Sequence, residues 1–130
     1  MKAYIKQISY YLPQRILSNE KLVEEFPEWT VDKIASKVGV NNRHVAGEQE
    51  TALDMAVAVA NNLFAANPDI QREDVDFVLF CTQSPDYFLP TSACLIQEQL
   101  GLRTNIGAID YNLGCSGYVY GLAVAKGLII

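Results

Sequence analysis

The sequence predicts an α/β fold, and two of its stretches lead to that expectation. Val75 to Cys81 (VDFVLFC) is an almost uninterrupted apolar run, the pattern of a strand that is covered on both faces of a parallel sheet. Ile106 to Tyr111 is a second short run with strand character, and it leads through Gly114-Cys-Ser-Gly117 into an apolar stretch long enough for a helix. Strands that alternate with helices in this way are typical of α/β domains.

Composition and charge exclude several classes of protein. At 130 residues, half of them hydrophobic and 19% charged, the chain can form a core, and we expect residues 1–130 to form one domain. The net charge is −5 and the basic residues are scattered, which argues against a nucleic-acid surface. The three cysteines match neither a disulfide framework nor a metal motif, and no charged-then-apolar leader begins the chain, so we expect a reduced, cytoplasmic protein. No apolar run reaches the ~20 residues of a membrane span.

Local signals place the elements of the first half of the chain. Helix caps and stops are recognised by Ser or Thr before a helix and by Gly or Pro after it, and strands by β-branched and aromatic residues. The expected elements are a strand over 3–9, a helix from Ser18-Asn-Glu20 through Phe26, a second helix capped by Thr30 and closed by Gly39, and a polar turn over 40–45 that carries His44.

The second half begins with a long helix. Thr51 to Asp54 resembles a capping box with Asp in place of Glu, and an apolar stripe follows until Asn67-Pro68 ends the helix. Thr91 to Leu100 predicts a further helix. The chain ends in the apolar Gly127 to Ile130 without a polar cap. We therefore expect residues 1–130 to be the first part of a longer protein, cut within the helix that follows Cys115 and lacking its C-terminal half; a buried C-terminal helix is the alternative.

Cys115 is the candidate nucleophile. A strand-to-helix corner places it at a helix N-terminus, where unpaired N–H groups and the macrodipole favour a thiolate. The alternative is a small hydrophobic residue at a buried turn. His44 is the only candidate base, but a histidine that follows a helix stop is more often a structural hydrogen-bonding group. Asp110 is interpreted as a solvated residue at a strand end, and the nearby tyrosines as core and pocket wall.

Three stretches together resemble β-ketoacyl-acyl carrier protein synthase III, a condensing enzyme of the thiolase superfamily. They are Ile8-Ser-Tyr-Tyr-Leu-Pro13, Gly39-Val-Asn-Asn-Arg-His44, and the run from Asp76 to Leu122, which holds Leu89-Pro-Thr-Ser-Ala-Cys-Leu-Ile-Gln-Glu-Gln-Leu-Gly101 and Asn112-Leu-Gly-Cys-Ser-Gly-Tyr-Val-Tyr-Gly121. The similarity spans nearly all of the chain. It implies the N-terminal portion of a thiolase-like, layered αβαβα fold.

The resemblance also implies a reaction. Cys115 would be acylated by an acyl-CoA and would then pass the acyl group to malonyl-acyl carrier protein with decarboxylation, without a permanently bound cofactor. Backbone N–H groups, including that of Cys115, would hold the oxyanion. Of the family's catalytic Cys, His and Asn only Cys115 can be matched, because the other two belong to the second half. The resemblance further implies a homodimer with acyl carrier protein and acyl-CoA as partners.

Substrate-binding positions follow from the same resemblance. Leu89 matches a residue that in the family reaches across the homodimer to close the partner's acyl pocket. Counted back from Gly39, Lys33 and Lys37 occupy the positions of the family's adenine-stacking Trp and its basic neighbour, with Trp29 four residues too early. A carrier-protein donor in place of CoA is therefore an alternative. Lys33, Lys37 and Arg43 are a candidate basic patch for an acidic carrier protein; ordinary solvated helix charges are the other interpretation.

Two other functions stay open at this point. One is an acyltransferase of the same superfamily that moves the acyl chain to a hydroxyl or amine. The other is a non-catalytic α/β binding module in which Cys115 is buried and inert.

Overall fold

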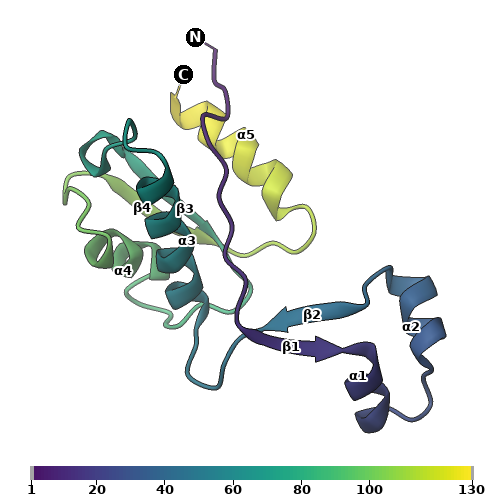
Figure 1. The fold of residues 1–130 in the computed structure, drawn as a ribbon. Coiled ribbons are helices and arrows are strands. Elements are labelled where there is room, and N and C mark those ends of the chain that lie inside the picture. Colours follow the sequence, from purple (N-terminus) through teal and green to yellow (C-terminus); the bar gives the residue numbers. More distant parts are fainter. Residues whose placement is uncertain (1, 130) are drawn as a thin grey trace. The chain divides into compact units, whose positions relative to one another are not determined.

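The computed structural model describes residues 2–129, and these form two compact units (Figure 1). The first unit combines the N-terminal segment, up to Tyr11, with the chain from Thr51 onward. The second unit is Leu12–Glu50. Each unit contains its own two-stranded sheet.

The first unit is an α/β assembly around a parallel strand pair. Strands β3 and β4 are paired so that Phe77 lies opposite Gly107 and Cys81 opposite Tyr111. This parallel pairing confirms the α/β class expected from the two apolar runs. The elements of the unit are α3 (Ala52–Ala66), the 3₁₀ turn η1 (Arg72–Asp74), β3 (Phe77–Cys81), α4 (Ser92–Gln99), β4 (Gly107–Tyr111) and α5 (Gly117–Ile129).

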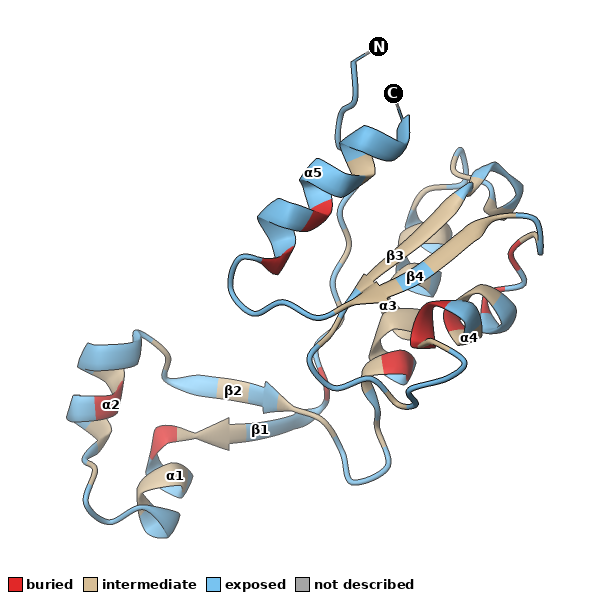
Figure 2. Ribbon diagram, turned by 180° about the vertical axis from the view of Figure 1, so that it is seen from behind, coloured by how far each residue is buried: buried red, intermediate tan, exposed pale blue. Residues whose placement is uncertain are grey.

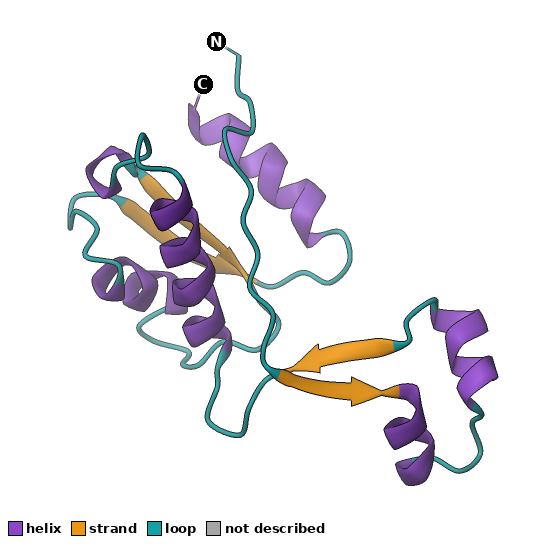
Figure 3. Cartoon of the chain, viewed as in Figure 1, coloured by secondary structure: helices purple, strands orange, loops and turns teal. Residues whose placement is uncertain are grey.

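Alternate residues of β3 face opposite sides of the sheet. Val78 and Phe80 pack in the core that α3 and α4 form over one face of the sheet. Phe77 and Leu79 line a hollow together with residues of α5 on the other face. The strand is apolar throughout because it is covered from both sides. The unit therefore has three layers, with α3 and α4 on one side of the strand pair and α5 on the other (Figures 1 and 3). The buried residues of the core are Leu53, Ile96, Leu100 and Leu102.

Local caps fix the ends of the helices in this unit. Thr51 accepts a hydrogen bond from the Asp54 N–H at 3.2 Å, and the Asp54 carboxylate accepts one from the Thr51 N–H at 2.9 Å. This reciprocal pair is the capping box that the sequence predicted. After α4, Gly101 adopts a φ of 63°, a left-handed conformation that glycine adopts without steric cost.

The second unit is an antiparallel strand pair that carries two short helices. Buried Asn19 ties them together, because its backbone N–H donates to the carbonyl of Asn41 at 3.1 Å and its side chain donates to the carbonyl of Val40 at 3.0 Å. The helix caps at Ser18 and Thr30 and the left-handed Gly39 are confirmed. The elements of the unit are β1 (Arg15–Ser18), α1 (Asn19–Glu25), α2 (Val31–Val38) and β2 (Asn42–Val45).

Two of the expected elements are wrong. Residues 3–9 form no strand; they are extended, and Tyr4, Ile5 and Ile8 are exposed. A strand needs a partner for its backbone groups, and no paired strand lies along this segment in the described part of the chain (Figure 3). The polar turn over 40–45 is largely the strand β2, which exists because it pairs with β1. That pairing is a long-range contact that the composition of either segment does not reveal.

Among residues 2–129, no helix combines the length and the apolar character that crossing a lipid bilayer requires.

The nucleophile corner, a candidate active site

Cys115 lies in the turn between β4 and α5, two residues before the helix begins. The turn is closed by the N–H of Gly117, which donates to the carbonyl of Gly114 at 2.8 Å. The first bond of helical type runs from the N–H of Tyr120 to the carbonyl of Ser116 at 3.1 Å, so Ser116 takes the N-cap position. The predicted strand-to-helix corner is thus confirmed. The Cys115 side chain is exposed, in contrast to the interpretation as a buried turn residue.

Several backbone N–H groups at this corner are open, that is, without a hydrogen-bond acceptor in the described part of the chain. Those of Cys115, Ser116, Tyr118 and Val119 have no acceptor among the described residues. N–H groups of this kind at a helix start, together with the helix macrodipole, attract negative charge. The corner can therefore hold the oxyanion that forms when a sulfur nucleophile attacks a carbonyl.

The first turn of α5 packs against the last residues of the two strands. The Tyr111 hydroxyl donates to the carbonyl of Gly117 at 2.8 Å, and the Cys81 thiol lies 3.6 Å from the carbonyl of Leu113. Gly117 and Gly121 are the buried residues of α5 (Figure 2). A methyl group on Gly117 would lie 2.5 Å from the Cys81 sulfur, and one on Gly121 would overlap the Tyr111 hydroxyl. Only glycines allow the helix to approach the strands this closely.

Asp110 is not the solvated residue that the sequence suggested. Its two carboxylate oxygens accept hydrogen bonds from the N–H groups of Ser92 at 2.8 Å and Ala93 at 2.7 Å. The carboxylate therefore caps the N-terminus of α4 from the neighbouring strand. The expectation was wrong because the partner lies on another element, at a place that local sequence does not indicate.

The loop that carries Leu89 is anchored at both ends. The N–H of Asp86 faces the hydroxyl of buried Ser92 at 3.4 Å, and the Asp86 carboxylate accepts from the N–H of Leu53 at 3.3 Å. Between these anchors Phe88 and Leu89 are 97% and 84% exposed. The loop thus exposes two large apolar side chains at the surface of this unit.

Lys33 and Lys37 lie over the ring of Trp29 in the second unit. Their ammonium nitrogens are 4.5 Å and 5.9 Å from the ring centroid. Lys33 follows Trp29 by four residues, and its ammonium group lies over the ring. The count from Gly39, which assigns the family's Trp position to Lys33, stays a prediction. Trp29 in turn lines an apolar hollow of about 300 Å³ together with Leu22, Phe26, Ile34, Val38 and Arg43.

Arg43 and His44 are held by the frame of this unit. The Arg43 guanidinium donates to the buried Asn19 side chain at 2.8 Å. His44 Nδ1 lies 2.6 Å from the carbonyl of Pro13, which can only accept, so Nδ1 carries the proton. The interpretation of His44 as a structural hydrogen-bonding group is supported, and Arg43 is at least partly committed to the same kind of role.

Sequence relatives share nearly the whole chain. A β-ketoacyl-[acyl-carrier-protein] synthase III of Sulfurovum is 42% identical over 131 residues, which cover 98% of this chain and 37% of the relative. A solved structure described as 3-oxoacyl-(acyl-carrier-protein) synthase III superposes with a TM-score of 0.89 at 50% identity, over 95% of this chain and 36% of the other. The synthase III of Thermus thermophilus gives a TM-score of 0.83 at 31% identity, over 93% and 36%. No protein-family model matches the chain.

The chain is homologous to β-ketoacyl-[acyl-carrier-protein] synthase III. It spans about two fifths of the length of the curated synthase III relatives it matches. Its fold is the N-terminal portion of the thiolase-like fold of those condensing enzymes, as the sequence predicted.

Sequence reasoning missed some residues that shape the corner of this synthase III homologue. Tyr111 was interpreted as core or pocket wall, and its hydrogen bond to Gly117 was not expected. The available signal was the spacing of Gly117 and Gly121, which places two residues without side chains one helical turn apart on the same face. Such a face predicts close contact with a bulky neighbour, although it does not say which one.

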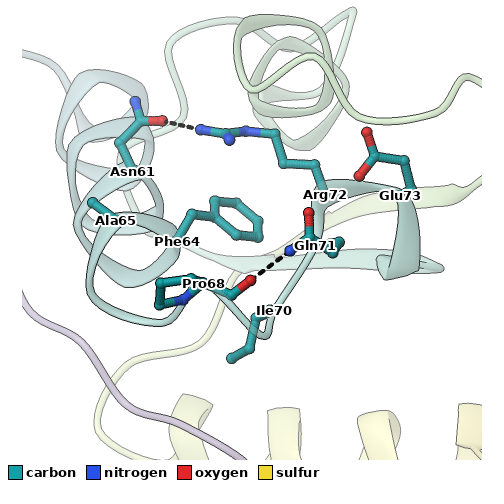
Figure 4. A pocket seen from close by; sticks show the side chains of 8 residues that line it. All are labelled: Asn61, Phe64, Ala65, Pro68, Ile70, Gln71, Arg72 and Glu73. Atoms are coloured by element: carbon teal, nitrogen blue, oxygen red, sulfur yellow. Dashed lines mark hydrogen bonds between the residues drawn. The ribbon is translucent and has the colours of Figure 1, made fainter.

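A hollow of about 560 Å³ near the end of α3 contains none of the predicted site residues. In it the Arg72 guanidinium lies 4.6 Å from the centroid of Phe64 and donates to Asn61 at 2.9 Å, while the Gln71 amide donates to the carbonyl of Pro68 (Figure 4). Most of its polar side chains thus already bond within the hollow. Among residues 2–129, no three His, Cys, Asp or Glu side chains gather as metal ligands would.

Proposed function

We propose that residues 1–130 are the N-terminal part of a β-ketoacyl-acyl carrier protein synthase III, and that Cys115 is its acyl-accepting nucleophile. The observation that carries the proposal is the position of Cys115 at a corner whose N–H groups are unpaired, in a chain that shares about 40% of its residues with such synthases. Because those relatives are more than twice as long, the activity is assigned to the full-length protein. Residues 1–130 alone are expected to be inactive.

The chemistry needs a thiolate and an oxyanion site. The Cys115 sulfur attacks the carbonyl carbon of an acyl-CoA thioester, and the open N–H groups of the corner hold the negative charge that develops on the carbonyl oxygen. Collapse of that intermediate leaves the acyl group on Cys115 and releases the CoA thiol. Loss of CO₂ from malonyl-acyl carrier protein then yields a carbanion, which attacks the acyl carbon and frees the sulfur. The His and Asn that promote this second half-reaction in the family belong to the portion beyond residue 130.

Partners follow from the same proposal. The anchored loop with exposed Phe88 and Leu89 suits contact with a second copy of the enzyme, in which Leu89 closes the acyl pocket of that copy. Lys33 and Lys37 offer positive charge beside Trp29 for the phosphates of CoA or for an acidic carrier protein. The full-length enzyme is proposed to be a cytoplasmic homodimer without a permanently bound cofactor.

Acylation of the full-length protein tests the proposal. The wild type, Cys115→Ser and Cys94→Ser are incubated with short acyl-CoAs and with acyl-carrier protein, and the covalent adduct is located by peptide mass spectrometry. The wild type and Cys94→Ser should carry the acyl group at residue 115 and should extend it when malonyl-acyl carrier protein is added. Cys115→Ser should lose condensation by about three orders of magnitude or more. Condensation that survives in Cys115→Ser, or an adduct on another cysteine, would contradict the proposal. Transfer to alcohols or amines in place of malonyl-carrier protein would favour the other acyltransferase class.

A further inference from the structure

The segment that carries Cys115 is closed into a loop by one side-chain hydrogen bond. The loop leaves β4 at Tyr111 and reaches α5 at Gly117, and the Tyr111 hydroxyl donates to the Gly117 carbonyl at 2.8 Å. Residues 112–116 therefore run between two points that are joined directly. The bond therefore fixes the distance between the two ends of the segment that carries Cys115.

The same bond acts on the open N–H groups of the corner. The carbonyl of Gly117 and the N–H of Tyr118 belong to one peptide unit, and that N–H has no acceptor among the described residues. A hydrogen bond to a peptide carbonyl polarises the unit and strengthens its N–H as a donor. A carbonyl oxygen has two lone pairs, so the bond from Tyr111 leaves one for the helix itself.

The close packing of α5 against Tyr111 and Cys81 requires glycine at two positions of the helix. Gly121 must lack a side chain because a methyl group there would overlap the Tyr111 hydroxyl, and Gly117 must lack one because of the Cys81 sulfur. Burial, and then the contact with Cys81, raise the pKa of the Tyr111 phenol. The hydroxyl consequently stays protonated, and able to donate, through neutral and mildly alkaline pH.

We propose that Tyr111 is a positioning residue for Cys115: its hydroxyl fixes the first turn of α5 and thereby aims the backbone N–H groups at the reacting sulfur and thioester. The inference rests on the proposed function, because it takes Cys115 as the nucleophile. Tyr111 does not touch the substrate and exchanges no proton with it.

The test removes the hydroxyl and measures the nucleophile directly. In the full-length protein, Tyr111→Phe is compared with the wild type and with Tyr120→Phe, a matched change on α5 at a tyrosine that is 60% exposed. Iodoacetamide labelling of Cys115 is followed by peptide mass spectrometry between pH 6 and 9, with Cys94 as internal reference, and kcat and KM for condensation are measured in parallel. Loss of this partly buried hydrogen bond should slow both Cys115 labelling at pH 7 and kcat by about threefold to tenfold. KM, the Cys94 rate and Tyr120→Phe should stay within about twofold of the wild type, the scatter expected when no hydrogen bond is lost.

The outcomes separate the two ideas. If Cys115 labels no faster than Cys94 in the wild type, the proposed function fails. If wild-type Cys115 labels fast and Tyr111→Phe labels equally fast with the same pH profile, only the role of Tyr111 is overturned. Equal losses in Tyr111→Phe and Tyr120→Phe also overturn it. Should Tyr111→Phe not fold, a fluorinated tyrosine at position 111 replaces it. This side chain keeps the shape of tyrosine but loses its hydroxyl proton at lower pH, so Cys115 reactivity should decline at lower pH than in the wild type. An unchanged pH profile of Cys115 labelling overturns the inference.

Discussion

Helices α4 and α5 lie in the same α/β unit, but the N–H groups at their N-termini differ in hydrogen bonding. Asp110 fills the start of α4 with a carboxylate that binds the N–H groups of Ser92 and Ala93. At the start of α5 the N–H groups of Cys115, Ser116, Tyr118 and Val119 are left without an acceptor. Two adjacent residues of β4 produce the difference, because Asp110 faces α4 and Tyr111 faces α5.

The difference shows how one strand can satisfy the N–H groups of one helix and leave those of another free to bind a substrate. A carboxylate at α5 would occupy the N–H groups and would repel a thiolate. A neutral hydroxyl bound to a carbonyl holds the helix equally close and leaves the N–H groups open. Adding a charge at α5, removing one at α4, or disturbing the contact between Tyr111 and α5 should therefore have separable effects. All the variants below are made in the full-length protein.

The largest effect is expected from a side chain on the glycine face of α5. Gly121→Val places branched methyl groups where the Tyr111 hydroxyl already lies, and overpacking of this kind costs about 1–3 kcal/mol or more. The free energy of unfolding in urea and the Cys115 labelling rate should both fall. Gly127→Ala is the control in the same helix, since nothing lies within 4 Å of its added methyl group. It should be neutral or stabilising by about 0.5–1 kcal/mol through helix propensity. A stable Gly121→Val protein would show that α5 does not depend on this contact.

A somewhat smaller effect should follow the loss of the carboxylate at α4. Asp110→Ala leaves two N–H groups without an acceptor, which should lower the free energy of unfolding by about 1–3 kcal/mol. Asp110→Asn retains one acceptor oxygen and should lose less. Because Asp110 faces away from α5, the Cys115 labelling rate in the folded protein should not change. A labelling rate that falls in step with stability would mean that the two helix starts are coupled.

Sequence reasoning succeeded where the determining contacts are local. The caps at Ser18, Thr30 and Thr51 act on N–H groups within three residues, so their patterns predicted the helices. The apolar run ending at Cys81 likewise predicted a strand with helices on both faces, and β3 is half-buried between them. Reasoning failed where a partner is distant: β2 depends on β1, and Asp110 caps a helix that begins eighteen positions earlier.

In the candidate site, too, the local contacts could be predicted from the sequence and the distant ones could not. The corner around Cys115 could be predicted because a strand, a glycine turn and a helix follow one another in the sequence. The contact between Tyr111 and Gly121 is short in sequence, but it depends on how closely α5 approaches the strands. The contact of Lys33 and Lys37 with the Trp29 ring depends on the backbone path into α2, which the sequence does not show.

The start of α3 provides a third helix N-terminus with an intermediate effect. Thr51→Ala removes the hydroxyl that accepts from the Asp54 N–H, and loss of such a cap costs about 1 kcal/mol. Urea unfolding should detect the loss, and the Cys115 labelling rate should remain that of the wild type. Thr51→Ser preserves the hydroxyl and is the matched control. If Thr51→Ser is as unstable as Thr51→Ala, the cap contributes through its methyl group and not through its hydrogen bond.

The smallest effect is expected from a substitution that places a carboxylate at the N-terminus of α5, as Asp110 does at α4. It tests the comparison of the two helices most directly. Ser116 occupies the N-cap position of α5, so Ser116→Asp introduces a carboxylate beside the open N–H groups. The charge favours the helix start by about 0.3–1 kcal/mol, yet it competes with the thiolate for the same groups. Stability should therefore rise slightly while Cys115 labelling at pH 7 slows by about threefold, the factor that corresponds to the middle of that range. Ser116→Asn caps without the charge and should leave labelling closer to the wild-type rate. Raising the salt concentration should reduce the difference between the two variants, because exposed charges are screened. Labelling that is as fast in Ser116→Asp as in Ser116→Asn would mean that the open N–H groups of α5 do not act on Cys115.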